Sequence, residues 1–569
     1  MAAADQAASV KTGIPSIVLM ERAALSVADE ISQRTDSGKR VMILSGPGNN
    51  GADGIAAGRI LLDRGYDVRF MLLTGKPPAP DSSMQVQRRI LQSYGAEPAV
   101  FDREAFLAFR PDVVVDALFG TGLGRELGGT AGEIVECVNA YRASTGASVL
   151  GLDIPSGISS EDGSVMGCAM MCDLTVTFAY YKRGHFLYPG STYCGEKVLR
   201  QIGITDLSFR QPGERTPLMY MTEPSDLRKY LPARDPSGNK GTFGKILIIA
   251  GSTGMCGAAV LSARAALRSG AGMVKVFTTD ANRVIIQQAV PEALLTTYTE
   301  LSCQDPGTAS CSGIPAKEEE EMERLRSRLI SDLQWADVAA IGPGLSRSGT
   351  SAFLLKTLLE AVSAGRDSSH GVSSGEIKCR DSSHGVSSGE IKCRGIVIDA
   401  DALRLLAQDR SLLDKVADRD PGVGCILTPH LLEFADLMHL SLKETGEARE
   451  ALLHELAERA GCAVTGKDAR TMIAGAGREE ICLITNGNSG MAAAGSGDVL
   501  TGITAAMLFE AIRAEGAGGD TKAAQYRAAE AAAYIHAAAG DRARDRLGEY
   551  GMTAGDLTKE IGAVMRELL

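Results

Sequence analysis

The sequence lacks the features that mark secreted, membrane-spanning and duplex-binding proteins. It contains no stretch of about 18 apolar residues, so we expect no membrane helix. Asp5, Lys11, Glu21 and Arg22 interrupt its first segment, which argues against a signal peptide. There is no long run of Lys and Arg, and the formal net charge of -11 argues against binding to duplex nucleic acid. We therefore expect a cytoplasmic protein with no membrane or nucleic-acid partner.

Paired cysteines are also scarce. The 12 Cys are scattered along the chain, and Cys168 and Cys172 form the closest pair. No C-x-x-C repeat of the kind that binds structural zinc is present. We expect reduced thiols, as in other cytoplasmic proteins, and no structural metal.

The chain does contain two series of alternating strand and helix patterns. Its 569 residues exceed one ordinary domain of about 100–200 residues. The first series starts with the buried strand "RVMILSG", a Gly-rich turn and a helix over 53–65; the second starts with "KILIIAGS". Pro, Gly and charge dominate the stretch at 215–235 that joins them, as in a linker. We predict an α/β protein with largely parallel sheets and domains over 1–220 and 221–569.

Two polar segments interrupt the second domain. Residues 303–325 are acidic and polar, and residues 366–393 contain "RDSSHGVSSGEIKC" twice in tandem. We interpret the repeat as an in-frame duplication in a solvated loop, since repeat folds need several units with apolar faces. Metal binding by the His and Cys residues of the two copies is the alternative.

A glycine-rich loop follows the first strand. The sequence "GPGNNG" (46–51) has the G-x-G-x-x-G spacing of dinucleotide-binding turns, in which bare backbone approaches a phosphate. A classical NAD site also needs an acid at the end of the second strand, and the corresponding stretch "FMLLTG" has none. The motif alone is weak evidence for a dinucleotide-binding site, although Asn49, Asn50 and Asp53 add polar side chains to the loop.

Further polar residues follow two later strands of the first half. Asp116 ends "VVVD", and Asp153 and Ser156 end "GLDIPS". The carboxyl ends of parallel strands line the binding crevice of an open sheet, so we expect these side chains to converge there. Each Asp taken singly has the alternative role of capping a turn or helix.

In the second half, "GSGD" opens a helix with Asp498 in its first turn. The helix dipole favours an ionised acid at that point, and bare amides at 495–497 would hold transferring phosphate. Asp498 would then take a proton from an attacking hydroxyl. The alternative is an Asp that stabilises the helix start and has no chemistry.

Four motifs of the first half resemble a known family. In order, "SGPGNNGADG", "DALFGTGL", "LDIPSG" and "YYKRGH" resemble the NAD(P)HX epimerase domain of bifunctional NAD(P)H-hydrate repair enzymes, a Rossmann-like αβα sandwich. The resemblance implies Asp153 as a catalytic residue and a potassium ion bound by Asn50, Asp116 and Ser156, whose oxygens suit a hard cation. The implied substrate contacts are Asn49, Asn50, Gly51, Ala52, Asp53, Gly120, Thr121, Gly122, Leu123, Gly124, Arg125, Glu126 and Asp153. Ala52 replaces a glycine of the family pattern, and we expect its methyl group to narrow the pocket.

The second half resembles the other domain of the same enzymes. "GSTGMCGAAV", "IGPGL", "VIDADAL", "LTPHLLEF" and "NSGMAAAGSGDVLTG" resemble the ADP-dependent NAD(P)HX dehydratase, with a ribokinase-like αβα fold. The resemblance implies substrate contacts by Ala258, Gly344, His430 and Asp498, with Asp498 catalytic, and nucleotide contacts by Lys467, Asp468, Ala469, Arg470, Thr471 and Gly497. "PHLLEF" and "KDART" depart from the usual P-H-P-G-E-F and K-G-N-P-T, which leaves the affinity for nucleotide open.

The resemblance thus implies an isomerase and a lyase on one chain. The first would interconvert R- and S-NAD(P)HX, and the second would dehydrate the S form with ADP, releasing AMP and phosphate. NADHX or NADPHX and ADP would be the ligands, potassium and magnesium the ions, and we expect a homo-oligomer. Two alternatives remain: a vitamin or sugar kinase fused to a nucleotide-binding domain, and a regulatory protein that senses nucleotide without turnover.

Overall fold

The chain forms two compact units, Met1–Thr216 and Pro217–Leu569. The computed structural model describes residues 13–74, 76–204, 219–229, 231–301, 316–363, 391–516 and 518–569. Within these ranges no helix is both long and apolar enough to cross a membrane. Each unit is a sheet covered by helices on both faces, so the predicted α/β class is confirmed.

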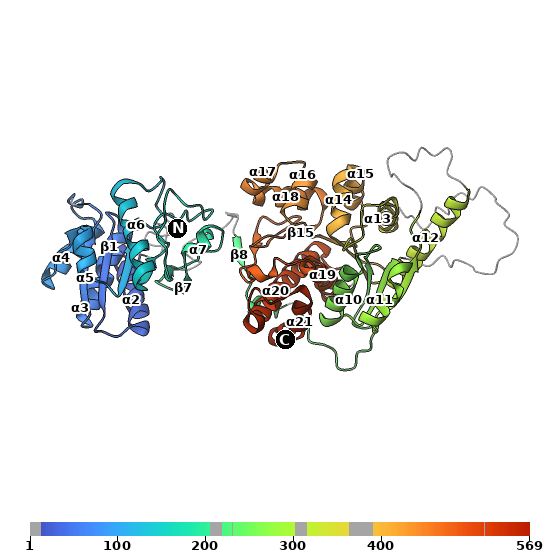
Figure 1. Ribbon diagram of the computed structural model, residues 1–569, viewed down its shortest axis with the longest axis horizontal. Coiled ribbons are helices and arrows are strands. Elements are labelled where there is room, and N and C mark those ends of the chain that lie inside the picture. Colours follow the sequence, from blue (N-terminus) through green and yellow to red (C-terminus); the bar gives the residue numbers. More distant parts are fainter. Residues whose placement is uncertain are drawn as a thin grey trace. The chain divides into compact units, whose positions relative to one another are not determined.

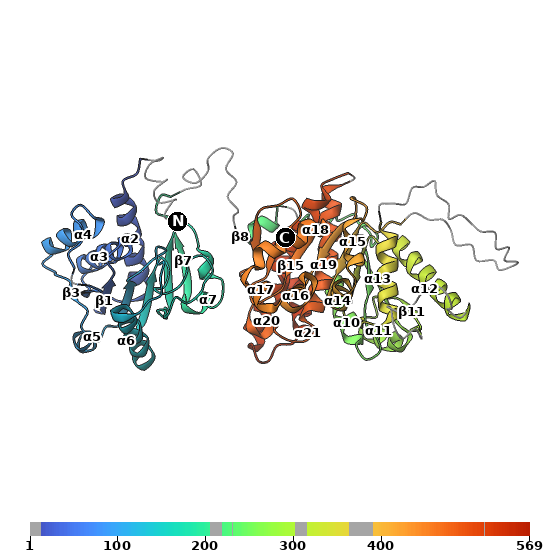
Figure 2. The same cartoon turned by 90° about the horizontal axis from the view of Figure 1, so that it is seen from above.

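The first unit contains a seven-stranded parallel sheet in the order β3-β2-β1-β4-β5-β6-β7. Helices α2, α3 and α4 cover one face, and α5 and α6 cover the other (Figure 2). The strands are β1 Arg40–Ser45, β2 Asp67–Leu72, β3 Ala99–Val100, β4 Val113–Ala117, β5 Ser148–Leu152, β6 Leu174–Phe178 and β7 Glu196–Arg200. The helices are α2 Ser16–Arg34, α3 Asn49–Asp63, α4 Ser83–Ser93, α5 Arg103–Phe109, α6 Gly129–Thr145, the 3-10 turn η1 Arg183–His185 and α7 Gly190–Tyr193.

The apolar run of β1 follows from its position in the middle of this sheet. Val41 and Ile43 enter the core under α2 and α3, whereas Met42 and Leu44 enter the core under α5 and α6. A strand buried on both faces needs consecutive apolar residues, because neighbouring side chains point to opposite sides. This is why the sequence marks the central strands clearly.

The helix after β1 begins earlier than expected. We predicted its start at residue 53, but α3 begins at Asn49, so the two asparagines lie in its first turn. A side chain at Gly46 would meet the carbonyl oxygen of Leu118 at 1.7 Å, and one at Gly51 would meet the oxygen of Gly46 at 2.0 Å. The glycines therefore allow the turn to pack directly against the β4 loop.

The second unit contains a ten-stranded sheet in the order β11-β10-β9-β12-β13-β14-β15-β16-β17-β8. The pairs β15–β16 and β16–β17 are antiparallel and the other pairs are parallel. The strands are β8 Met219–Met221, β9 Lys245–Ile249, β10 Met273–Thr279, β11 Leu294–Tyr298, β12 Val338–Ile341, β13 Gly395–Ile398, β14 Gly424–Leu427, β15 Ala463–Gly466, β16 Met472–Gly475 and β17 Ile481–Leu483.

Helices α10, α19, α20 and α21 cover one face of this sheet, and α13 to α18 cover the other (Figure 1). The helices, together with the 3-10 turns η2 and η3, are α9 Pro224–Leu227, α10 Cys256–Arg268, η2 Asp280–Asn282, α11 Arg283–Ala289, α12 Ala316–Trp335, α13 Gly349–Ala361, α14 Ala400–Gln408, α15 Arg410–Ala417, α16 Leu431–Met438, α17 Leu442–Glu447, α18 Arg449–Ala460, η3 Ser489–Met491, α19 Ser496–Glu515, α20 Thr521–Leu547 and α21 Ala554–Leu568. Small residues line the α10–α19 contact: a side chain at Gly502 would meet the Ser262 carbonyl oxygen at 2.1 Å.

Three expectations about this unit need correction or fall outside the structure. The stretch at 215–235 is not only a linker, because β8 joins the edge of the second sheet beside β17. The acidic segment at 303–325 is partly helical, since α12 starts at Ala316. Most of the tandem repeat at 366–393 lies outside the described residues.

Candidate active sites

A cavity of about 430 Å³ lies at the carboxyl ends of the first sheet's central strands. Its walls come from α2, the start of α3, the loop after β4 and the ends of β5 and β6. The expected substrate residues that line it are Asn49, Asn50, Asp53, Gly120, Thr121, Gly122, Leu123 and Asp153. Polar groups from separate strand ends therefore converge on one cavity, as parallel-sheet geometry requires.

Asp153 lies in a hydrogen-bond network that sequence reasoning did not identify. Its carboxylate forms an ion pair with Lys182, whose side chain is only 3% exposed, and accepts a hydrogen bond from Thr177 Oγ1 at 3.0 Å. Lys182 Nζ also donates to Thr177 Oγ1 at 2.8 Å. The ring of His185 bonds the Asp153 carbonyl oxygen at 2.8 Å. These contacts hold Asp153 at a backbone φ of +64°, a conformation that Asp tolerates better than most residues.

A buried carboxylate lies next to this cavity. Asp116 accepts hydrogen bonds from Ser156 N at 2.7 Å, from Ser156 Oγ at 2.6 Å and from Leu118 N at 3.2 Å. Burial raises the pKa of Asp116 to about 6, against these hydrogen bonds. The Asn50 side chain lies against Gly120, and its amide nitrogen is buried without a hydrogen-bond partner in the described chain. This nitrogen is a donor and needs an acceptor, whereas the oxygen of the same amide is the atom that suits a cation.

Five expected substrate residues do not line the cavity among the described residues: Gly51, Ala52, Gly124, Arg125 and Glu126. Ala52 is fully buried in the core under α3. Its methyl group therefore does not narrow the pocket as we had expected. Arg125 and Glu126 are exposed on the loop before α6.

The second site lies at the carboxyl ends of the central strands of the second sheet. Gly344 follows β12, Asp399 follows β13, His430 follows β14 and Lys467 follows β15. Gly344 has a φ of +55°, and a side chain there would meet Ala258 Cβ at 2.9 Å. The expected substrate residues Ala258 and Gly344 are thus neighbours, although they come from α10 and from the loop after β12.

A buried ion pair forms the floor of this site. Lys467 Nζ lies 2.7 Å from Asp399 Oδ1, and Thr501 on α19 donates to the other oxygen of Asp399. Burial alone would raise the pKa of Asp399, but the Lys467 charge and the hydrogen bonds lower it overall. A Cβ at Gly497 would lie 3.4 Å from Lys467 Nζ, so a lysine ammonium faces bare backbone at the start of α19.

Asp498 lies in the first turn of α19, whose N-cap Gly495 has a φ of +90°. Burial, followed by the negative charges of Asp399 and Asp401, raises the pKa of Asp498 to about 6, against the opposing charge of Lys467. We had expected the helix dipole to keep Asp498 ionised, and a pKa of about 6 still leaves it mostly ionised at neutral pH, although burial and nearby acids oppose the ionised form. We had also expected three free amides, but Ser496 N donates to Ala493 O at 3.2 Å.

His430 is the N-cap of α16 and forms a capping box with Glu433. His430 N donates to Glu433 Oε2 at 3.0 Å, and Glu433 N donates to His430 Nδ1 at 3.3 Å. Burial lowers the pKa of His430, and burial raises the pKa of Glu433 to about 7. The half-exposed imidazole caps the helix through Nδ1, and its Nε2 lies 3.2 Å from Glu433 Oε1.

The expected nucleotide residues Lys467 to Thr471 form the loop that joins β15 to β16. Lys467 turns inward to Asp399, whereas Asp468 and Ala469 are exposed. Arg449 on α18 holds the loop through an ion pair of 3.0 Å with Asp468 and a hydrogen bond to Gly466 O. The changed middle of this motif thus lies on the surface, and its first residue lies in the site.

Comparisons with known proteins agree with both halves of the chain. Residues 16–184 match the family described as YjeF-related protein N-terminus, and residues 246–365 and 386–563 match the NAD(P)H-hydrate dehydratase family. A bifunctional NAD(P)H-hydrate repair enzyme of Moorella thermoacetica is 32% identical over 99% of this chain and 95% of its own length. The Escherichia coli enzyme of the same description is 28% identical over 96% of this chain and 88% of its own.

Among solved structures, the chain resembles the ADP/ATP-dependent NAD(P)H-hydrate dehydratase of Bacillus subtilis, co-crystallised with ATP and Mg²⁺. The identity is 23%, the TM-score is 0.44, and the match covers 62% of this chain and 99% of that one. The Rossmann-like and ribokinase-like αβα folds implied by the sequence motifs are confirmed. The family matches and the full-length relatives identify the chain as a member of the family of bifunctional NAD(P)H-hydrate repair enzymes.

Proposed function

We propose that this chain repairs hydrated NADH and NADPH with one active site in each unit. The first would interconvert the R and S epimers, and the second would dehydrate the S epimer using ADP. The observation that carries the proposal is Asp498. It lies at the start of α19 beside the Asp399–Lys467 pair, and its pKa of about 6 suits a general base near neutral pH.

In the dehydratase site, Asp498 takes the proton of the C6 hydroxyl as that oxygen attacks the β-phosphorus of ADP. The bond between the β-phosphorus and the bridging oxygen breaks, and AMP leaves. The C6 phosphate ester then departs as inorganic phosphate while C5 loses a proton, which restores the double bond. Lys467, held by Asp399, supplies positive charge beside the phosphates, where preorganised charge lowers the barrier.

Magnesium fits this site only as a partner of the nucleotide. No group of three or more His, Cys, Asp or Glu that could hold a metal occurs in the described parts of the chain. Mg²⁺ usually binds through one or two carboxylates and the substrate phosphates, so a protein cage is not needed. When bound, it would shield the phosphate charges. Asp399 and Glu433 are the buried carboxyl groups nearest Lys467.

In the epimerase site, Asp153 is the proposed catalytic residue. Inversion at C6 requires the hydroxyl to leave one face of the ring and water to add to the other. The ionised Asp153 would take the proton of the incoming water, and the neighbouring Lys182 ammonium would give the proton that the leaving hydroxyl needs. Asp153 lines the cavity, and Lys182 and Thr177 hold one of its oxygens in place. The Gly-rich loop Gly120–Leu123 would contact the rest of the dinucleotide.

The residues around Asp116 fit a potassium ion. Asp116 is fully buried and forms no ion pair within the described chain, so a bound cation would compensate its charge. Carboxylate, amide and hydroxyl oxygens suit a hard cation. Asn50, Asp116 and Ser156 would hold the ion, which would supply a positive charge beside the Asp116 carboxylate.

The proposal is tested by supplying S-NADHX and ADP and following the absorbance of regenerated NADH. We expect one AMP and one inorganic phosphate per NADH formed. A stable phosphorylated product without NADH would instead indicate a small-molecule kinase.

A further inference from the structure

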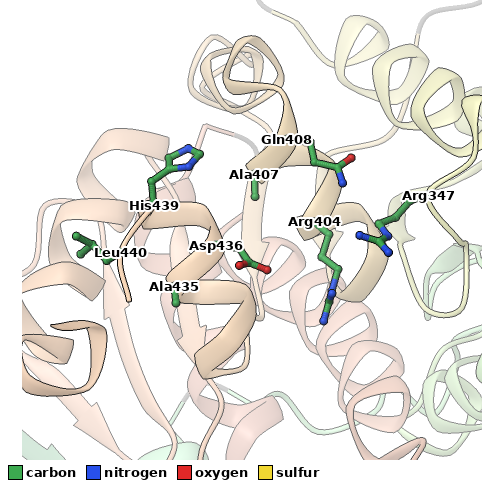
Figure 3. A pocket seen from close by; sticks show the side chains of 8 residues that line it. All are labelled: Arg347, Arg404, Ala407, Gln408, Ala435, Asp436, His439 and Leu440. Atoms are coloured by element: carbon green, nitrogen blue, oxygen red, sulfur yellow. The ribbon is translucent and has the colours of Figure 1, made fainter. Parts of the chain in front are cut away.

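A second cavity, of about 350 Å³, is lined by segments that continue from the dehydratase site, and Figure 3 shows its lining side chains. It lies between helices α14 and α16, and the loop after β12 closes one side. Its lining residues are Arg347, Arg404, Ala407, Gln408, Ala435, Asp436, His439 and Leu440. None of these residues has a role in the chemistry proposed above.

Two arginines dominate the charge of this cavity. Figure 3 shows Arg347 reaching toward Arg404 from a separate segment, with Asp436 on the opposite helix. In the described chain, neither guanidinium forms an ion pair or donates a hydrogen bond, unlike Arg449 with Asp468. Two unpaired guanidinium groups that face one cavity repel each other, and a bound anion would relieve this repulsion. The planar fork of Arg matches phosphate oxygens in particular.

The cavity is built from continuations of the segments that form the dehydratase site. Arg347 follows Gly344 by three residues, and α14, which carries Arg404, starts directly after Asp399. Helix α16, which carries Asp436, starts directly after His430. After burial and the Lys467 charge, the charge of Arg404 also helps to lower the pKa of His430, and it opposes the burial that raises the pKa of Glu433, so it acts within the site. A ligand that contacts Gly344 and His430 would therefore lie next to the two segments that line this cavity.

We propose that this cavity holds the adenosine ribose of the hydrated dinucleotide, with Arg347 and Arg404 binding the 2′-phosphate of NADPHX and Asp436 binding the 2′-hydroxyl of NADHX. In dinucleotide sites generally, an acid accepts a hydrogen bond from the ribose 2′-hydroxyl and an arginine accommodates the 2′-phosphate. This cavity offers both groups. The inference rests on the proposed dehydratase function, and it explains how one site would accept both hydrates.

A terminal phosphate fits the cavity better than the pyrophosphate bridge does. A phosphate monoester carries up to two negative charges and three free oxygens, enough for two arginine forks. The bridging phosphates are singly charged and have a ribose on each side, so they need an open groove. The same phosphate chemistry could come from ADP, and the experiment separates the two sources.

The test compares kcat/KM for S-NADPHX and S-NADHX at saturating ADP in four variants. Arg347→Gln should lower kcat/KM for NADPHX about tenfold or more, mainly through KM. Arg404→Gln should likewise lower kcat/KM for NADPHX more than for NADHX, although NADHX also loses some rate because the charge of Arg404 acts on His430 and Glu433. Asp436→Asn should weaken NADHX more than NADPHX. Arg410→Gln, an exposed arginine outside the cavity, should change neither substrate and controls for the loss of one positive charge.

Several results would overturn the inference. Equal losses on both hydrates would place the arginines on a shared part of the ligand or give them a purely structural role. A raised KM for ADP would show that the arginines bind the phosphates of ADP. An unchanged kcat/KM for both hydrates would show that the cavity does not bind the hydrate. Wild-type protein that dehydrates neither hydrate would refute the proposed function itself. Arg347 is exposed, so Arg347→Gln should fold, and NADHX turnover reports folding directly.

Discussion

At the scale of single residues, buried carboxyl groups set the conditions under which each site would work. Asp498 and Asp116 both have pKa values raised to about 6, mainly by burial. The raised pKa has a different effect at each site, because the proposed role of Asp498 is to accept a proton, whereas that of Asp116 is to hold a cation. Each role gives its own dependence on solution conditions.

Dehydration should lose activity as the pH falls through about 6. Asp498 must be ionised to accept the proton, and its pKa is raised from 3.8 to about 6, so kcat/KM should fall roughly tenfold per pH unit below that value. The measurement is kcat/KM for S-NADHX from pH 5 to 8. Glu433, with a pKa of about 7, is the competing titration, so the midpoint should stay near 6 in Glu433→Gln. A flat profile down to pH 5 would remove Asp498 from the role of base.

Potassium should support epimerisation through Asp116. Ionised Asp116 is unfavourable in the empty site above pH 6, because its folded-state pKa exceeds the ordinary 3.8. Potassium bound only by the folded protein should therefore raise the melting temperature, by about 2–4 °C per kcal/mol of binding linkage. Asp116→Asn should lose both this shift and the potassium dependence of the epimerisation rate. Equal rates and melting temperatures in potassium and in tetramethylammonium would contradict the site.

At the scale of elements, the first turn of α3 joins the fold to the epimerase cavity. Its residues Asn49 and Asn50 line the cavity, and Gly51 packs against the β1–α3 turn. Gly51→Ala would place a methyl group 2.0 Å from the Gly46 oxygen, so the helix must move. We expect at least tenfold slower epimerisation, unchanged dehydration and a lower melting temperature of the first unit. Gly38→Ala, with open space around it, is the matched control, and a Gly51→Ala rate equal to that control would contradict the argument.

The elements also show what the sequence could predict. The central strands β1, β4 and β9 were predicted from their unbroken apolar runs, which a strand needs when both its faces are buried. The strand β7, with the sequence "EKVLR", was not predicted, because it is a partly exposed edge strand without an apolar run. The start of α3 was misplaced because Asn-Asn-Gly resembles a turn.

The sequence predicted site residues that belong to a recognisable motif. It did not predict the role of a residue when that role depends on contact with a residue far away in the chain. Asp153 and Asp498 follow strand or glycine motifs. Lys182 and Asp399 lie within the quoted motifs "YYKRGH" and "VIDADAL", yet their roles depend on Asp153, 29 residues away, and on Lys467, 68 residues away. Such pairings arise only once the strands are assembled side by side.

At the scale of the whole molecule, the tandem repeat should be dispensable. It lies largely outside the described residues, and the match to the dehydratase family is interrupted at 366–385. Deleting 380–393 leaves one complete copy, and halving the length of a connecting segment changes its closure free energy by only about 0.6 kcal/mol. We expect nearly unchanged melting temperature and dehydration rate. A large loss of either would show that the second copy contributes to folding or to the site.

The central claim is that one chain carries two separate active sites, and one assay on an equal mixture of R- and S-NADHX with excess ADP tests it most directly. Wild-type protein should convert the whole mixture to NADH. Asp498→Asn should slow NADH formation by about 10²–10⁴-fold while R and S still interconvert, and Asp153→Asn should convert the S half and leave the R half. The account would be contradicted if Asp498→Asn also stopped epimerisation, or if Asp153→Asn consumed the R half at the wild-type rate.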